Sequence, residues 1–166
     1  MSTSSDLIYG IALVKFGGVE IGWLSQDGLQ PAGTAPSSTP IYAAQVKDGP
    51  VISLLTTPGL TAFTATLIDL SAEAMINVIG GTTDDNGGYE PPEKWEKSGV
   101  MDIKCDSGHT IRLYNAKVSG TDFGNGINTS NVLGLGIRIE VMKDANGKRL
   151  KTFKPGIDPE TGLPEA

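Results

Sequence analysis

Glycine and proline divide this sequence into short segments, and this feature constrains the fold more than any other. The 166 residues include 22 Gly and 10 Pro, whereas charged residues make up only 19%. The segments between them are short and rich in apolar and threonine residues. Such a pattern is typical of many short strands joined by turns and long loops, and not of long helices. We therefore expect a mainly β protein.

A tight hairpin is expected near the N-terminus. Two short runs of alternating apolar and polar residues, Ala12–Phe16 and Val19–Trp23, flank Gly17-Gly18. Two consecutive glycines suit a type I′ turn, because both of its central residues need positive φ. The alternation predicts that the buried side of this hairpin carries Val14, Phe16, Val19 and Ile21.

Further strands are expected wherever an apolar or Thr-rich run is bounded by turn residues. Pro and Gly end several of these runs, since Pro presets φ and Gly permits positive φ. The run near the C-terminus, Val132–Lys143, alternates apolar residues with Arg138, Glu140 and Met142 on the other face. The expected strands are Ile41–Lys47, Val51–Thr57, Leu60–Leu67, Val100–Cys105, Thr110–Val118, Val132–Lys143 and Lys148–Phe153.

One short helix is expected at about residues 71–79. Ser71 is a good N-cap, and Leu70 and Met75 occupy the positions of a hydrophobic staple. Gly80-Gly81 ends the helix through a left-handed C-cap. A helix this short is unstable alone, so its apolar stripe must cover a sheet. The expected stripe is Ala72, Met75, Ile76 and Ile79.

These elements predict one domain over residues 1–154, followed by a flexible acidic tail at residues 155–166. The fold class is mainly β: an antiparallel β-sandwich or barrel with one short flanking α-helix and long loops. No apolar stretch approaches the roughly 20 residues that a membrane-spanning helix needs. The N-terminus lacks the basic region of a secretory signal. With one cysteine, Cys105, the chain fits a reducing compartment.

Charge is unevenly distributed along the chain. The net charge of −6 argues against a protein that wraps nucleic-acid backbone. Acids dominate residues 1–110 and 155–166, whereas bases dominate residues 111–154. This asymmetry is consistent with head-to-tail attraction between copies. Separately solvated loops are an equal alternative.

Two long loops rich in Gly and Pro are candidate contact segments. Residues 25–40 form either an extended arm that reaches a neighbouring subunit or a surface excursion. Residues 82–99 contain Tyr89 and Trp95. These aromatics either fold back on the base of the loop or anchor a contact with another chain.

The sequence offers no convincing catalytic or metal site. Cys105 and His109 share a tight turn, which supplies at most two zinc ligands and no orienting group for a nucleophile. The acidic turn at residues 84–88 lacks the ligand spacing of an EF-hand, so it would bind calcium only opportunistically. We expect no enzyme, no metal and no cofactor.

The order of elements resembles that of the tail tube proteins of tailed bacteriophages, which are related to the tube proteins of contractile injection systems. The likeness rests on the glycine-centred hairpin Val14–Gly22, the Pro/Gly-rich loop after it, the Thr-rich strands, and the passage from strand to helix at Phe63–Gly81. As a pattern it covers most of residues 8–142.

The resemblance implies a structural virion protein, the major tail tube subunit. Six copies would form a ring, and rings would stack into a hollow tube through which DNA passes without specific binding. Assembly in the cytoplasm of a bacterial host, a final place in the virion tail, and no membrane association are implied. The implied partners are other copies of the chain and tail sheath, tape-measure and tail terminator proteins.

Contacts between subunits are then expected in residues 25–40 and 82–97 and in the basic region 138–154. Alternatives are a tube subunit of a contractile injection system and a non-catalytic β-sandwich binding or decoration module. The candidate inter-subunit contact residues are Tyr89, Trp95, Trp23, Arg138, Lys148 and Arg149.

Overall fold

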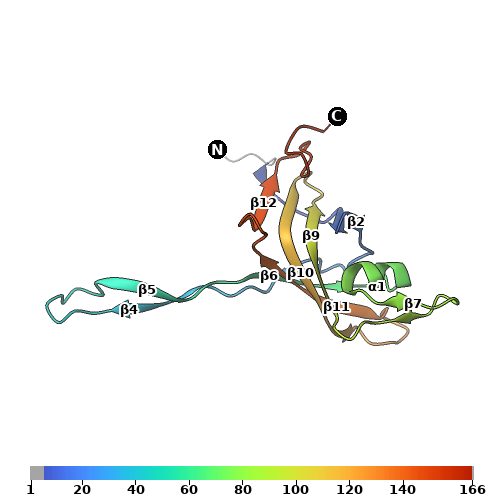
Figure 1. Cartoon of the computed structure of the whole chain (residues 1–166), viewed down its shortest axis with the longest axis horizontal. Coiled ribbons are helices and arrows are strands. Elements are labelled where there is room, and N and C mark those ends of the chain that lie inside the picture. The colour runs from blue at the N-terminus through green and yellow to red at the C-terminus, as the bar shows by residue number, and fades with distance from the viewer. Residues whose placement is uncertain (1–5, 166) are drawn as a thin grey trace.

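A computed structural model describes residues 6–165 of the chain, which form a β-rich body with a long projection (Figure 1). Strands dominate and one short helix is present in this range, so the expected mainly β class is confirmed. The elements are β1 (Leu13–Phe16), β2 (Val19–Glu20), β3 (Gln30–Pro31), β4 (Ser37–Ile41), β5 (Ile52–Thr57), β6 (Thr61–Leu67), α1 (Ala72–Ile79), β7 (Thr82–Thr83), β8 (Tyr89–Glu90), β9 (Glu96–Lys104), β10 (Thr110–Gly124), β11 (Gly134–Met142) and β12 (Leu150–Phe153).

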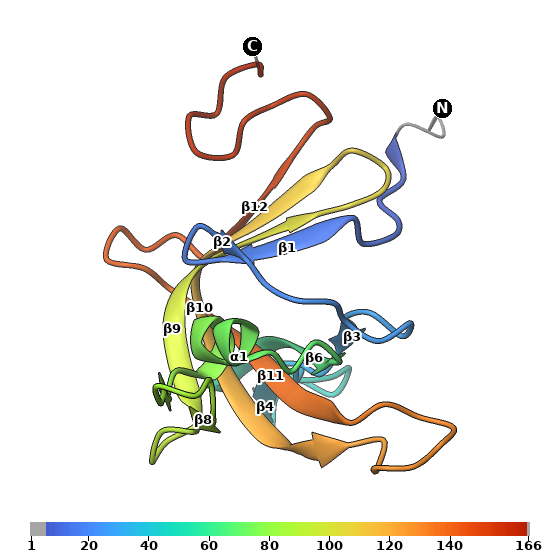
Figure 2. The same ribbon diagram turned by 90° about the vertical axis from the view of Figure 1, so that its right-hand side faces the viewer.

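The body is built on one antiparallel sheet of eight strands. Its order is β2-β1-β9-β10-β11-β6-β3, and β12 pairs with β10 beside this path. The long β10 pairs along one edge with β9, and along the other with β12 and then with β11. The sheet therefore bends strongly along β9 and β10 (Figure 2). Over the described residues it does not close into a barrel.

Two β-bulges set which residues of β10 face the core. The register with β9 shifts between Leu113 and Ala116, and the register with β11 shifts between Gly120 and Asp122. A bulge inserts an extra residue, so the set of inward-facing positions changes after it. Leu113 is buried before the first shift, and Ala116 and Val118 are buried after it. The bulges thus keep the apolar side chains of a bent strand on one face.

Helix α1 covers the inside of the bend (Figure 2). Ser71 caps it, its side chain accepting a hydrogen bond from the backbone N–H of Ala74 at 3.3 Å, and Gly80 ends it at φ 84°. The expected boundaries are confirmed. The expected stripe is partly wrong, because Ala72 and Ile76 are only half-buried. The helix is rotated toward the sheet so that its buried residues are Ala74, Met75, Val78 and Ile79.

The N-terminal hairpin forms as expected. Phe16 pairs with Val19 across Gly17 and Gly18, whose φ values are 64° and 83°. Val14, Phe16 and Ile21 are buried, but Val19 is 45% exposed because β2 is an outer strand only two residues long. The prediction that Val19 faces the core is therefore wrong.

Most of the other expected strands are present with shifted ends. The first run, Ile41–Lys47, is the exception: only Ile41 belongs to a strand, and the following residues turn. Conversely, β4 begins at Ser37, inside the segment that was expected to be a loop. Polar Ser and Thr residues there pair with β5, since backbone hydrogen bonds do not require apolar side chains.

The side of the sheet away from the core is polar and carries three ion pairs. All six residues of these pairs lie on β9, β10 or β11, and all except Glu96 stand next to buried positions. Lys117 and Glu96 approach to 3.3 Å, and Arg138 and Glu140 to 3.2 Å. The third pair, Arg112 and Asp102, is 3.6 Å apart and mostly buried. Because each pair joins one basic and one acidic residue, the three pairs together add no net charge to this face.

After β12 the chain forms compact turns. Ile157 bridges to Pro164, and the N–H of Asp158 donates to the carbonyl of Leu163 at 2.9 Å. The boundary at 154 and the mobility of the following tail stay predictions. Within residues 6–165, no helix has the length and apolar character needed to cross a lipid bilayer.

Candidate functional site: an apolar arm and an open groove

A two-stranded hairpin projects from the body as an arm, which we define as residues 35–59 (Figure 1). At its base, Thr34 and Leu60 exchange two backbone hydrogen bonds of 2.8 and 2.9 Å. Beyond this bridge, β4 and β5 pair with each other as a separate sheet. At about 3.3 Å per strand residue, the stretch from Thr34 to Ile41 alone reaches roughly 23 Å, and the turn at the tip extends beyond it.

The base of the arm is closely packed backbone. A Cβ on Gly33 would overlap the carbonyl oxygen of Leu60, and one on Gly59 would lie 3.0 Å from Cδ of Pro36. Gly33 therefore permits an approach of the two chains that a side chain would prevent. The narrow base holds the arm at a defined exit from the sheet, continuous with β6.

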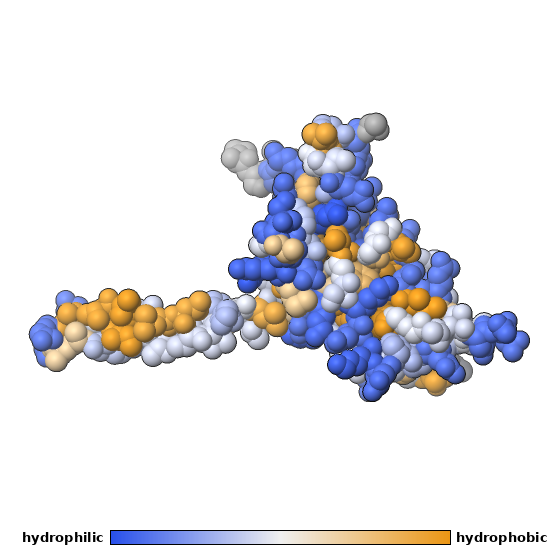
Figure 3. Space-filling view, in the orientation of Figure 1, coloured by the Kyte–Doolittle hydropathy of each residue, from blue (hydrophilic) through white to orange (hydrophobic). Residues whose placement is uncertain are grey.

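The arm exposes large apolar side chains on both of its faces. Ile41 pairs with Ile52, and Leu54 lies on the same face two residues along. Leu55 and Val51 alternate with these, so they lie on the opposite face. Space-filling shows the apolar residues gathered along the arm (Figure 3). The exposed large apolar residues of the arm are Ile41, Tyr42, Val46, Val51, Ile52, Leu54 and Leu55.

Such a hairpin is not expected to persist alone in water. An isolated pair of strands is marginally stable at best, and an apolar strand edge invites pairing. Lys47 and Asp48, at the tip, are the only charged residues of the arm. Strands that are apolar on both faces are typical of strands covered on both sides. The arm thus has the composition of a buried element in an exposed position.

The edge strands of the body sheet are protected against pairing with other strands, whereas the strands of the arm are not. The terminal strands β2 and β3 have two residues each, and β3 contains Pro31, which cannot donate a hydrogen bond. Strand β12 carries Lys151 and follows Lys148 and Arg149. Short edges, proline and lysine all oppose unwanted strand pairing. The body therefore discourages strand pairing at its edges, whereas the arm presents an edge that is open to pairing.

A second apolar surface lies on the body, where a groove of about 740 Å³ opens between the N-terminal segment and the loop after β2. We call it the N-terminal groove; its walls are residues 8–14 and 20–29, with Phe63, Ile103 and Ile111 at its base. Trp23 on its rim is 80% exposed, and Tyr9 and Ile8 are also exposed. Grooves of this size, lined by aromatic and aliphatic side chains, are typical binding sites.

The three aromatic residues predicted to contact another subunit lie in different settings. Tyr89 is half-buried in the body, and its hydroxyl donates to the carbonyl of Gly80 at 2.6 Å. Burial raises the pKa of Tyr89 above its ordinary value. Trp95 packs on the core, with its ring edge-on to Phe123 at 5.7 Å. Both aromatics thus fold back on their own loop, whereas Trp23 is free to make contacts.

The three predicted basic contact residues are also separated. Arg138, on β11, is bound to Glu140, and Lys148 and Arg149 are exposed before β12. Lys148 lies 5.3 Å from the ring centre of Tyr114. The structure does not bring these residues together with Trp23, Tyr89 or Trp95 into one site. Their roles as contact residues stay predictions.

The Cys105–His109 turn is built as structure. The two residues close it through a backbone hydrogen bond of 2.9 Å, and Nδ1 of His109 lies 3.0 Å from the hydroxyl of Ser107. Burial, and secondarily Asp106, raise the pKa of the Cys105 thiol. A thiol held protonated is a poor nucleophile. Among residues 6–165, no three His, Cys, Asp or Glu side chains are grouped as metal ligands would be.

The sequence offered residues 25–40 as either an extended arm or a surface excursion. Residues 35–40 do belong to the projection, whereas residues 25–34 run along the body and the projection extends to residue 59. The available signal was the adjacent apolar pairs Ile41-Tyr42, Val51-Ile52 and Leu54-Leu55 within an almost uncharged segment. Adjacent apolar residues in a strand face opposite sides, which indicates cover on both.

No family model and no curated protein matches this sequence. Among solved structures, the chain is similar to the PVC sheath/tube terminator of an extracellular contractile injection system, determined by cryo-EM in the extended state. The two are 15% identical, with a TM-score of 0.43, over 89% of this chain and 95% of that chain.

Proposed function

We propose that this protein is a non-catalytic structural subunit that assembles with copies of itself through its arm. In the finer form of the proposal, the copies form rings that stack into a hollow tail tube, as in the tail tube proteins whose sequence pattern the chain resembles. The observation that carries the proposal is the arm: a preformed hairpin, apolar on both faces and almost uncharged, held away from its own body.

The arm favours assembly over capture of a small ligand because of where its apolar surface lies. Contiguous exposed apolar surface on a folded protein marks a protein contact. A projecting hairpin encloses no cavity, so it buries its side chains only when another surface covers them. Since both faces are apolar, the covering surfaces must lie on two sides. A subunit inserted between neighbours meets this condition.

The decisive experiment removes the arm without disturbing the body. Because Thr34 and Leu60 already form a bridged pair, residues 35–59 can be replaced by Asn-Gly, which makes a two-residue hairpin turn. We call this the armless variant. We expect the wild-type protein to form rings and tubes in negative-stain micrographs and the armless variant to stay monomeric. The wild-type monomer and the armless variant should unfold at the same thermal midpoint, because no residue of the arm belongs to the core.

A milder variant distinguishes a specific effect of the arm from a general effect of exposed apolar residues. Leu54→Ser with Leu55→Ser should block assembly, because it removes one apolar contact on each face. The matched control is Ile127→Ser with Val132→Ser, two exposed apolar residues of a distant loop. Normal tubes from the armless variant, or a wild-type protein that stays monomeric at high concentration, would contradict the proposal. The second result would favour a binding or decoration module.

A further inference from the structure

We infer that the N-terminal groove is the receptor for the arm tip of a second copy of this chain. This inference rests on the proposed function and goes beyond it, because it names the surface that receives the arm. Over residues 6–165, the structure describes an apolar projection that no part of the body covers and an open apolar groove, and they lie on different parts of the molecule.

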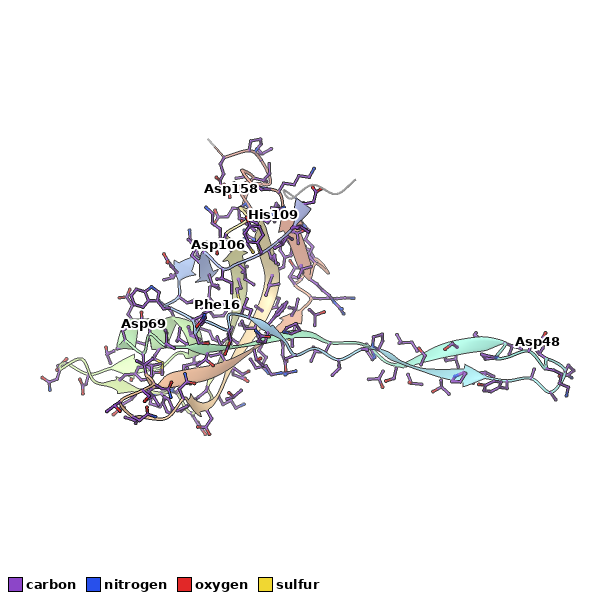
Figure 4. All side chains as sticks on the ribbon, turned by 180° about the vertical axis from the view of Figure 1, so that it is seen from behind. Phe16, Asp48, Asp69, Asp106, His109 and Asp158 are labelled. Atoms are coloured by element: carbon purple, nitrogen blue, oxygen red, sulfur yellow. The ribbon has the colours of Figure 1, made fainter. Side chains whose placement is uncertain are left out.

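The arm cannot fill the groove of its own chain. Asp48 marks the arm tip, whereas Asp106, on the wall of the groove, lies in the body, well away from the arm (Figure 4). The closely packed base formed by Thr34, Leu60 and Gly33 fixes the direction in which the arm leaves. An arm that occupies the groove must therefore come from another copy.

The groove is acidic, and the tip of the arm carries one residue of the opposite charge. Among the described residues that line the groove, the charged ones are Glu20, Asp27 and Asp106, all acidic. Lys47 is the only basic residue of the arm and lies at its tip, between Val46 and Asp48. In the inferred contact the tip is seated with Lys47 among the carboxylates, Val46 and Tyr42 against the apolar lining, and Asp48 toward solvent. Because the reverse seating would place Asp48 among like charges, the charge of the groove fixes the register of the contact.

The groove also offers an aromatic side chain of the kind that dominates protein interfaces. Trp23 is 80% exposed on the rim, and its backbone carbonyl accepts a hydrogen bond of 2.8 Å from the N–H of Ile68, which fixes the segment that carries it. A rigidly held, exposed tryptophan beside an apolar groove is a typical energetic hot spot. The inferred contact therefore covers the Trp23 side chain, which the single subunit leaves exposed.

Cysteine cross-linking tests the contact directly. Val46→Cys is placed in one batch of protein and Asp27→Cys in another, and the two are mixed before assembly and oxidised. The native Cys105 also lines the groove, so both variants are made in a Cys105→Ser background. We expect a covalent dimer from this mixture. The matched control pairs Val46→Cys with Lys148→Cys, which lies outside the groove and should not cross-link.

The outcomes distinguish the inference from the proposed function. Assemblies that form without the Val46→Cys to Asp27→Cys dimer, or that give the control dimer equally, would overturn the groove as receptor and leave assembly standing. A mixture that never assembles would overturn both.

A second variant provides an independent measurement. Trp23→Ala should leave the thermal midpoint of the monomer unchanged, because the side chain is exposed, but should raise the concentration needed for assembly about tenfold or more. Ile127→Ala, a similarly exposed apolar truncation away from both surfaces, should shift that concentration by less than about twofold. Equal effects of the two variants would refute a specific role for the groove.

Discussion

At the scale of single residues, Ser71 and Asp102 show two opposite uses of a polar side chain. The hydroxyl of Ser71 satisfies a backbone N–H that the first turn of α1 leaves without a helical partner. Asp102 lies beside Arg112, yet its Oδ1 atom is buried without a hydrogen bond. The first arrangement stabilises an element, whereas the second places a costly charge inside the protein.

The cap predicts a measurable loss of stability. Ser71→Ala should lower the free energy of unfolding by about 1 kcal/mol, because the N–H of Ala74 loses its acceptor. Urea unfolding followed by circular dichroism measures this change. Ser53→Ala, at an exposed position of the arm, serves as the control and should change the free energy little. An equal effect at the two positions would contradict the capping role.

Asp102 predicts a pH dependence of stability. Burial raises its pKa above the ordinary value; Arg112 and Lys15 oppose this rise, and Glu160 and Asp158 add to it. The folded protein therefore holds this proton more tightly than the unfolded chain does. Its contribution to stability is complete below the unfolded pKa of about 3.9 and is lost as pH rises through the higher folded pKa.

The corresponding variant is Asp102→Asn, which removes the titration. Relative to this variant, the wild-type protein should lose unfolding free energy as the pH rises from about 4 toward neutrality. Urea titrations of both proteins across this range provide the comparison. A constant difference, or a wild type that gains stability over the range, would show that the pKa of Asp102 is not raised.

At the scale of elements, the sequence predicted the features that depend only on residues adjacent in the chain, such as turns and helix ends. Gly17-Gly18 specified a hairpin, and Ser71 with Gly80 specified both ends of α1. The rotation of the helix was not predictable, because it depends on how β9 and β10 bend beneath it. Nor could the sequence show that β4 and β5 leave the body, since a strand pattern does not say which surface the strand will meet.

The packing of α1 predicts a cavity effect. Ile79 is fully buried and lies near Gly120, at the centre of the bend. Ile79→Ala should therefore lower the free energy of unfolding by about 2–5 kcal/mol. Ile76→Ala, on the half-buried side of the helix, should cost clearly less. Chemical denaturation of the two variants tests the observed orientation, and the reverse order would support the stripe first expected from the sequence.

At the scale of the whole molecule, the proposed contact joins two unlike surfaces, the arm of one copy and the groove of another. Such a head-to-tail interface gives closed rings when its rotation closes and open filaments when it does not. The candidate surfaces were only partly predictable from sequence. Trp23 was selected as a contact residue, but the groove beside it is formed by segments that are far apart in the sequence, such as those that carry Gly10 and Asp106.

A head-to-tail contact predicts that the armless variant acts as a terminator of growth. It retains a groove, so it can accept the arm of a wild-type neighbour, but it offers no arm to the next copy. A small fraction of the armless variant mixed with wild-type protein should co-sediment with it and shorten or open the assemblies. Full-length assemblies from which the armless variant is excluded would contradict this expectation.

The ion pairs on the polar face of the sheet have a consequence for any charged molecule that meets this face. Charges that cancel within a few ångströms produce a field that fades quickly, and salt screens what remains beyond about 8 Å. A long polyanion sliding across Lys117–Glu96 and Arg138–Glu140 would meet neither a deep electrostatic well nor a high barrier. If copies of this face line a passage, a charged molecule can pass these ion pairs without being held or repelled strongly.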